Sequence, residues 1–362
     1  MNNSLRMLLG LSAFALVLLT VGCTKSVARA EATKRWNTTR AEMATRLGEG
    51  CFQRGEFGRA REHIEECIRN GAPYAPMYVL AARLSTEKGD LDMARTYAEN
   101  AKAIDPKSAE ARYVLGTIEQ TLGHGDIAFE EYAEAARLDP KQPKFVLAAV
   151  ELLVAQGKAD IAAQALDEAA TQMPGRWEIY AARGDVLSAL KRDGEAVGCY
   201  RIAIRLEPNR PELTERLATA LFCSGAYAEA EPKLAELAEC QPAFATGWVL
   251  RMRAECLLAL NRPKEARSIY QGLVRAGRAG IDGLVGQAKC DLMEGRLASA
   301  EKFLAEALAR DAQHVEANGL MGYVLVVTGK KGEAVPHLTL AMKDEHFSGR
   351  ATVEKLLARA QQ

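Results

Sequence analysis

The side chains that could carry out chemistry are scattered along this 362-residue sequence rather than grouped. The chain lacks the C-x-x-C, H-E-x-x-H, G-x-S-x-G, Walker and G-x-G-x-x-G motifs. We therefore predict that the protein is not an enzyme, and we expect no cofactor, metal or small-molecule substrate. A cluster of acid, base and histidine in one deep pocket would reverse this prediction. The five histidines are His63, His124, His314, His337 and His346.

Cys23 is the residue for which the sequence favours a specific covalent modification. It follows an apolar run from Met7 to Gly22, whose 16 residues are fewer than the ~20 needed to span a bilayer and have the layout of a secretory signal. The stretch LTVGC resembles the lipobox of bacterial lipoproteins, with Thr20 in place of the usual leucine. This resemblance implies that residues 1–22 are removed and that Cys23 is diacylated and then N-acylated. The alternatives are an ordinary signal followed by a chance cysteine, and an uncleaved anchor.

The residues after Cys23 indicate a location in the bacterial cell envelope. Several acyl chains hold a protein stably at a membrane, whereas a single chain binds only marginally. Thr24 stands where aspartate would mark retention in the inner membrane, so the resemblance to Gram-negative lipoproteins implies an outer-membrane protein that faces the periplasm. The inner membrane is the alternative. Residues 23–40 are polar and basic, and we expect either a tether or a leading helix that begins near Ala30.

A repeat with a period of about 34 residues runs through most of the chain. The phrases RTYAENAKAIDP, FEEYAEAARLDP and VGCYRIAIRLEP are near copies of one another. A small alanine marks each copy; a glycine commonly stands five residues before it and a proline twelve residues after it. Nine copies are visible, and one gap between them is two residues longer than the others. The marking alanines are Ala60, Ala94, Ala128, Ala162, Ala196, Ala230, Ala266, Ala300 and Ala334.

Each copy is predicted to be a pair of helices. The first half has apolar residues at helical spacing and ends at a glycine, while the second half ends before a proline, and both are helix stop signals. Helices this short are marginal alone in water, so they must be stabilised by stacking against neighbouring copies. A larger side chain at the marking Ala128 would overpack such a contact. We expect further close contacts at Gly48, Gly116, Gly184 and Gly322.

These features resemble the tetratricopeptide repeat, a helix-turn-helix unit of about 34 residues. The resemblance covers residues 41–347 and implies an all-α fold, a right-handed α-α superhelical solenoid of about nine repeats. Residues 348–362 are expected to form a capping helix. The copy closest to the family pattern is YVLGTIEQTLGHGDIAFEEYAEAARLDP, in which the matching residues are Leu115, Gly116, Gly123, Ala128, Tyr132, Ala135 and Pro140.

The seven cysteines other than Cys23 are an odd number and cannot all pair within one chain. Cys51 and Cys67 lie on the two helices of one repeat and are the best candidates for an intramolecular disulfide. Cys256 and Cys290 occupy the same place in successive repeats, where stacked helices hold them about 9–10 Å apart, beyond the ~7 Å limit for a disulfide. We expect most of these cysteines to be small buried hydrophobic residues.

The resemblance also implies where a partner protein binds, because the first helices of such repeats line a concave groove. Numbered so that the marking alanine is position 20, positions 2, 5, 9, 12 and 13 of each repeat face the groove. These positions hold twelve acids (residues 42, 49, 87, 110, 151, 178, 185, 212, 215, 255, 282 and 316) and four bases (83, 144, 251 and 289). An acidic groove with apolar anchors fits a basic or amphipathic peptide. The predicted groove residues are Glu49, Phe52, Glu110, Tyr113, Glu178, Asp185, Glu215, Phe222, Trp248, Glu255, Lys289, Leu292 and Tyr323.

Composition favours a protein partner, because 47 basic and 47 acidic residues leave no excess of positive charge for nucleic acid. The acidic bias of the groove has an alternative explanation: a solvated solenoid face can carry it without binding anything, and its apolar groups can pack on neighbouring helices. With the lipid-attachment signal, the sequence predicts a membrane-anchored interaction scaffold. In architecture alone it resembles the type IV pilus pilotins, lipoproteins that help secretin subunits assemble. A scaffold for export of exopolysaccharide or another envelope polymer is the alternative function.

Overall fold

The computed structural model describes residues 29, 31–345, 347 and 349–361, with the exception of 241–245 and 277–279. These residues form helices and turns, without a strand, which confirms the predicted all-α fold. Contacts divide the chain into two compact units, unit 1 ending at Pro174 and unit 2 beginning at Gly175. Cys23 and the predicted signal lie outside the described residues, so the lipid attachment stays a prediction.

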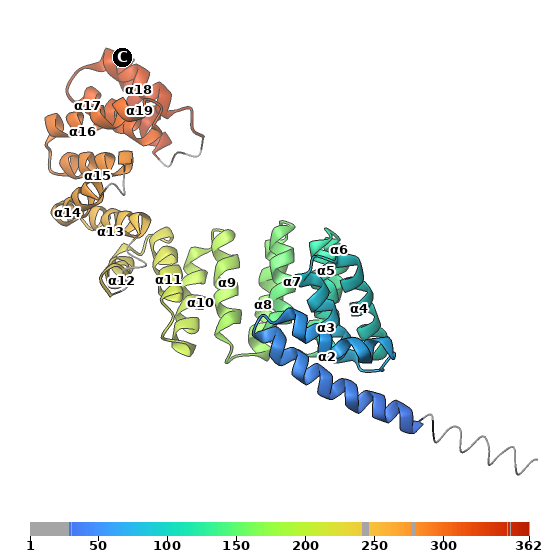
Figure 1. Ribbon diagram of the computed structural model, residues 1–362. Coiled ribbons are helices and arrows are strands. Elements are labelled where there is room, and N and C mark those ends of the chain that lie inside the picture. Colours follow the sequence, from blue (N-terminus) through green and yellow to red (C-terminus); the bar gives the residue numbers. More distant parts are fainter. Residues whose placement is uncertain are drawn as a thin grey trace, which may run out of the picture. The chain divides into compact units, whose positions relative to one another are not determined.

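Unit 1 consists of four helix pairs, in which each helix packs against the next (Figure 1). Its first helix, residues 31–53, includes part of the predicted tether, so residues 31–40 are helical. The remaining helices of unit 1 are α2 (Phe57–Arg69), α3 (Ala75–Glu87), α4 (Leu91–Ile104), α5 (Ala109–Thr121), α6 (Gly125–Leu138), α7 (Pro143–Ala155) and α8 (Ala159–Gln172).

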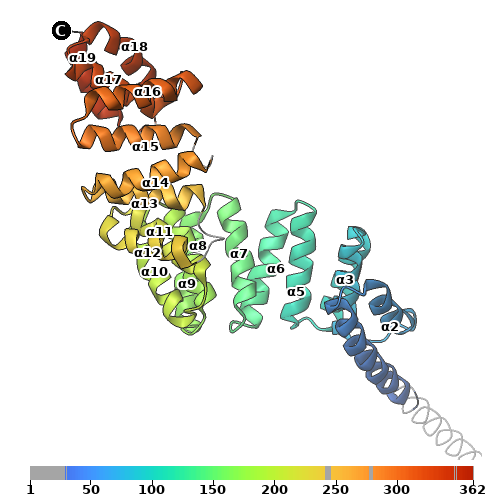
Figure 2. The same ribbon diagram turned by 60° about the vertical axis from the view of Figure 1, so that its left-hand side comes forward.

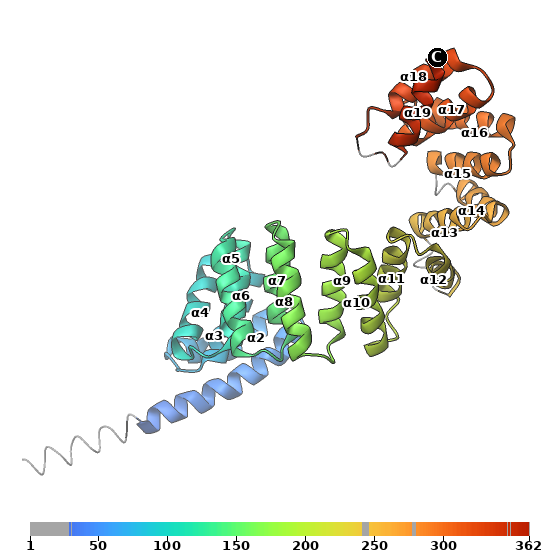
Figure 3. The same cartoon turned by 180° about the vertical axis from the view of Figure 1, so that it is seen from behind.

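Unit 2 has five helix pairs and one additional helix. Figure 3 shows α9, α10 and α11 side by side, and Figure 2 shows the later helices stacked in chain order. The last helix, α19, occupies the predicted capping segment and packs against α17 and α18. The helices of unit 2 are α9 (Trp177–Ala189), α10 (Asp193–Leu206), α11 (Pro211–Cys223), α12 (Tyr227–Cys240), α13 (Gly247–Ala259), α14 (Pro263–Arg275), α15 (Gly280–Met293), α16 (Leu297–Arg310), α17 (Val315–Val327), α18 (Lys331–Ala341) and α19 (Arg350–Ala360).

The small residues lie at the helix contacts, as the repeat pattern predicts. All nine marking alanines are fully buried. A methyl group added at Gly116 would stand 2.8 Å from the ring of Tyr132, and one added at Gly322 would stand 2.4 Å from Leu338. Neither distance is compatible with an unshifted neighbour, so these glycines allow the two helices of a repeat to approach closely.

The turn inside each repeat requires a left-handed backbone conformation. Seven of the nine repeats place glycine there, with φ between +73° and +85°, as at Gly89 and Gly295. The other two repeats place Lys191 (φ 61°) and Asn261 (φ 59°) at the same position. Glycine adopts this conformation without steric cost, so the glycine series marks the end of each first helix.

The disulfide considered between Cys51 and Cys67 is absent from the structure, where both residues are free thiols. Each is buried in the apolar core of the first repeats together with Ala60 and Ile64. They act there as small apolar side chains, in keeping with the usual behaviour of buried free cysteine. Cys256 and Cys290 are also free and buried.

We predict that Cys223 reacts with a thiol reagent far faster than the five buried cysteines Cys51, Cys67, Cys199, Cys256 and Cys290. Cys223 is exposed, although partial burial also raises the pKa of its thiol. Burial raises the pKa of Cys256 to about 12 and that of Cys290 to about 11. The thiolate is the reactive form, so these buried thiols should label only on unfolding. Brief treatment with N-ethylmaleimide at pH 8 and peptide mass mapping would measure this, with Cys223→Ser as the control. Rapid labelling of Cys51 or Cys67 would contradict the prediction.

Candidate functional site

The first helices of the repeats form the inner layer of each unit. Contacts join α3 to α5 in unit 1, and α9 to α11 and α13 to α15 in unit 2. Among the described residues, no two consecutive second helices make a comparable contact. Because the first helices are the more closely spaced, they lie on the inner side of each unit. We call the surface formed by their exposed side chains the groove; it is the candidate binding face.

The four bases of the groove are all paired with acids on the first helices of neighbouring repeats. Arg83 lies 3.3 Å from Glu49, and Lys144 pairs with Glu110. In unit 2, the guanidinium of Arg251 lies 2.6 Å from Asp282. The pairs therefore link one repeat to the next, and we refer to them as the groove ion pairs. Glu49, Glu110 and Asp282 were predicted to face the groove from their positions in the repeat, but their neutralisation by bases of neighbouring repeats was not predicted.

Lys289 is the most enclosed of these bases. Its ammonium group lies 2.9 Å from Glu255 and 2.6 Å from Glu316, so that it bridges three successive repeats. Burial would lower the pKa of Lys289, but the attraction of the two carboxylates outweighs it and raises the pKa above its ordinary value. Lys289 is therefore charged at neutral pH and acts as a structural cation in the groove.

Tyrosines on the second helices form hydrogen bonds with several side chains of the groove. The hydroxyl of Tyr200 donates to Asp185, and that of Tyr270 donates to Glu255, each at 2.8 Å. In unit 1 the hydroxyl of Tyr132 donates to Gln120 at 2.8 Å. These tyrosines all stand at position 24 of their repeats, and this recurrence is a sequence signal from which their role could have been predicted. They hold the groove acceptors in fixed positions.

Unit 1 has a hollow of 380 Å³ in its groove. Two of the predicted anchors, Phe52 and Tyr113, line it, each with a cation over its ring: Arg83 at 4.3 Å and Lys144 at 5.2 Å from the ring centre. Its charged lining is balanced, with two acids and two bases. The complete lining is Phe52, Arg83, Thr86, Glu87, Glu110, Tyr113, Val114, Thr117, Ile118 and Lys144. This hollow is therefore amphipathic rather than acidic.

The acidic surplus of the groove lies chiefly in unit 2, on α9 and α11. Among the described residues, Glu178, Glu212 and Glu215 have no ion pair. Burial raises the pKa of Glu215, Arg216 opposes this effect, and the neighbouring charge of Glu212 adds to it. One oxygen of Glu178 is buried without a hydrogen-bond partner. We call these three carboxylates the acidic cluster; Glu212 and Glu215 repel each other, and Arg216 offsets the charge of Glu215 only in part.

The predicted apolar anchors of unit 2 divide into two groups. Trp248 and Tyr323 each retain 39% of their surface, which leaves both available to a partner. Phe222 is partly buried and packs edge-on against Tyr227, with ring centres 5.6 Å apart. Leu292 is also partly buried against the core. Trp248 and Tyr323 are therefore the anchors that the structure leaves most exposed.

Comparison with known families identifies the repeating unit. Models of the tetratricopeptide repeat match residues 75–108, 147–211 and 194–244. The chain contains tetratricopeptide repeats. A model of the coatomer epsilon subunit matches residues 244–361. The tetratricopeptide fold is that of an interaction scaffold, in which stacked repeats present an extended surface to other proteins.

Two curated proteins show the range of the similarity. The type IV pilus assembly protein PilF of Pseudomonas aeruginosa is 27% identical over 146 residues, 40% of this chain and 58% of that protein. The BBSome complex member BBS4 of Bos taurus is 24% identical over 237 residues, 65% of this chain and 44% of that protein. The matched part of the chain thus spans about half the length of these relatives. A solved structure of Pseudomonas aeruginosa PilF aligns with a TM-score of 0.46 at 22% identity, covering 59% of this chain and 97% of that one.

The tetratricopeptide repeats of this chain are also joined by buried ion pairs outside the groove. Glu119 on α5 is 1% exposed and lies 2.8 Å from Arg95 and 2.7 Å from the ring of His124. Asp291 on α15 is equally buried and lies 2.7 Å from Arg267. Neither of these buried carboxylates was predicted from the sequence. Finally, none of the described helices is both long enough and apolar enough to cross a bilayer.

Proposed function

We propose that this protein is a membrane-anchored scaffold whose groove binds a basic, amphipathic segment of a partner protein, and that it assists the assembly of an envelope machine such as a pilus or a secretion complex. The acidic cluster of unit 2 is the observation that carries the proposal. Elsewhere in the groove, acids such as Glu49 and Asp282 are neutralised by the neighbouring repeat. The acidic cluster instead leaves charge for a partner to neutralise.

The rest of the groove supports a segment with apolar as well as basic side chains. Trp248 lies on α13, the next first helix after the acidic cluster, and exposes a large apolar surface. Buried aromatic residues commonly provide much of the energy of a protein interface. A helix with lysines on one face and apolar side chains on the other satisfies both features.

Two observations outside the groove support the anchored and assembly aspects of the proposal. The LTVGC sequence before Thr24 supports lipid attachment at Cys23. The similarity to a protein named for type IV pilus assembly supports a role in building an envelope complex. Together they favour a scaffold that holds a subunit near the membrane while the complex forms.

Neutralising the acidic cluster should weaken peptide binding. We expect the double variant Glu212→Gln, Glu215→Gln to bind a fluorescent, amphipathic lysine-leucine peptide about three- to tenfold more weakly than the parent protein, with a smaller dependence on salt. Fluorescence anisotropy at two ionic strengths would measure both effects. The matched control is Glu236→Gln, Glu306→Gln, which removes the same charge from exposed second-helix sites paired with Lys233 and Arg310. Equal losses in the two variants would count against a groove site.

The anchor and the partner can be tested in one experiment. Intact mass measurement of protein purified from envelopes should show acylated Cys23, and secretin or pilus subunits should co-purify. A Cys23→Ala variant should move to the soluble fraction. Co-purification of polymer-export proteins instead would support the alternative scaffold function, and an unmodified Cys23 would contradict the anchor.

A further inference from the structure

One buried ion pair occurs at the same place in two separate pairs of repeats. Arg95 is the fifth residue of α4 and contacts Glu119 on α5 at 2.8 Å. Arg267 is the fifth residue of α14 and contacts Asp291 on α15 at 2.7 Å, with the same separation along the chain. In both cases an arginine of a second helix reaches an acid near the end of the next first helix. The two acids are each 1% exposed, whereas the side chains of Arg95 and Arg267 retain 41% and 18% of their surface.

The first pair of repeats has the arginine of this pair but lacks the acid. Arg61 is the fifth residue of α2, and the residue at the matching separation is Ser85, near the end of α3. Among the described residues the side chain of Arg61 has no hydrogen bond or ion pair. The carboxylate of Asp90 accepts a hydrogen bond from the backbone N–H of Met93 at 3.2 Å and caps α4. Arg61 is therefore an arginine whose usual counter-ion is replaced by a small hydroxyl side chain.

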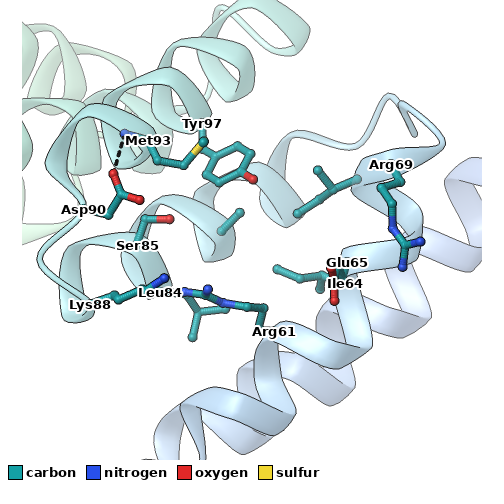
Figure 4. A pocket seen from close by; sticks show the side chains of 12 residues that line it. Arg61, Ile64, Glu65, Arg69, Leu84, Ser85, Lys88, Asp90, Met93 and Tyr97 are labelled. Carbon is teal, nitrogen blue, oxygen red and sulfur yellow. Dashed lines mark hydrogen bonds between the residues drawn. The ribbon is translucent and has the colours of Figure 1, made fainter.

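A hollow of 340 Å³ lies at this place, between α2, α3 and α4. Figure 4 shows Arg61 extending from α2 toward Leu84 and Lys88, with Ser85 beyond and Tyr97 and Met93 on the opposite wall. Its volume is within the range of ligand pockets, about 300–1,000 Å³. We call it the Arg61 hollow; it shares no lining residue with the hollow in the groove.

The lining of the Arg61 hollow combines positive charge with apolar surface. Arg69 and Lys88 add two further cations whose side chains have no hydrogen bond or ion pair among the described residues. Against the three cations stand Glu65 and the capping Asp90. The apolar part of the lining is Ile64, Ile68, Ala81, Leu84, Met93 and Tyr97. The lining of the hollow is thus complementary to a single carboxylate that has apolar groups on either side.

We propose that the Arg61 hollow binds a glutamate side chain of a partner protein, presented between apolar residues. The partner's carboxylate takes the place that Glu119 and Asp291 occupy beside Arg95 and Arg267. Its apolar neighbours contact Leu84, Met93 and Tyr97. A protein segment is favoured over a free small acid because the matching group in the other repeats is a side chain carried by a polypeptide. This partner is opposite in charge to the one proposed for the groove, so the protein has two distinct binding surfaces.

Two fluorescent peptides test the proposal on the full chain: acetyl-Leu-Leu-Glu-Leu-Leu amide and its Gln counterpart. The Glu peptide should bind at least tenfold more tightly than the Gln peptide. Arg61→Met should abolish this preference, because it removes the charge that binds the carboxylate. Arg61 is exposed, so the substitution should leave the fold intact. Arg59→Gln is the matched control, since Arg59 lies on the same helix, pairs with Glu56 and is not part of the hollow lining.

Ser85→Glu provides an independent test, because it restores within the chain the acid that the other repeats contain. We expect this variant not to bind the Glu peptide and to have a higher midpoint of thermal unfolding than the parent protein. A disrupted fold would instead lower that midpoint. Equal affinity for the Glu and Gln peptides, or unchanged peptide binding in Arg61→Met, would overturn the proposal. Binding of octanoate without binding of either peptide would assign the hollow to small aliphatic acids and would also overturn it.

Discussion

Asp291→Ala is expected to lower the free energy of unfolding by about 2–4 kcal/mol, because it removes one carboxylate of a buried ion-pair network and leaves Arg267 with Glu294 alone. The carboxylate is 1% exposed and lies 2.7 Å from Arg267, which itself retains 18% of its side-chain surface. Urea unfolding followed by tryptophan fluorescence would show a lower midpoint at unchanged slope. Glu306→Ala is the control, because its pair with Arg310 is exposed and should contribute less than about 1 kcal/mol.

Asp291 should also make the stability of the protein depend on pH in acid. Burial would raise the pKa of Asp291, but hydrogen bonds from Ser299, Arg296 and Arg267 outweigh it and hold the pKa below its ordinary value of 3.8. A lowered pKa stabilises the folded state above pH 3.8, and that stabilisation is lost as the pH falls through the folded-state value. Asp291→Asn should therefore flatten the fall in stability below pH 4. An identical acid profile in the variant would contradict this assignment.

Gly184→Ala is expected to destabilise the protein by about 1–3 kcal/mol, the usual cost of overpacking a close contact. The added methyl group would stand 2.5 Å from the ring of Tyr200, whose hydroxyl donates to Asp185. The direction of the change in stability is informative, because alanine in place of glycine within a helix otherwise stabilises a protein by roughly 0.5–1 kcal/mol.

Gly198→Ala in the same repeat is the matched control for this substitution. Gly198 lies within α10, and a methyl group there would meet no atom within 4 Å. It should therefore raise the unfolding midpoint while Gly184→Ala lowers it. Stabilisation by both substitutions would show that Tyr200 can shift away from the added methyl group without a loss of stability. Loss of the Tyr200 hydrogen bond should also loosen the position of Asp185 in the groove.

The sequence predicted those parts of the fold that recur at a fixed spacing. Small residues at a constant period, such as Ala128 and Gly184, can only mark contacts between stacked helices, and both lie at such contacts. Positions facing the groove could be assigned in the same way, because every repeat presents the same helix faces. Trp248 and Tyr323 stand at two of these positions and are each 39% exposed.

Interactions between different repeats were harder to predict, because they depend on which side chains meet across an interface. Glu119 and Glu212 look alike in the sequence, yet one is buried beside Arg95 and the other is exposed. Counting acids and bases gave the net charge of the groove but not its local neutralisation by residues such as Lys289. Separations between opposite charges that recur from one repeat to another would have identified these pairs.

The groove ion pairs also restrict how this gene can change by recombination. Repeats of equal length are easily deleted or duplicated, and such changes keep the period and the buried alanines intact. Deleting the repeat that contains Lys289 would bring Glu255 and Glu316, the two acids that it bridges, face to face. Like charges in contact would then replace an attractive network in unit 2. The ion pairs of Lys289 therefore favour the present order of these three repeats, although each is built on the same helical plan.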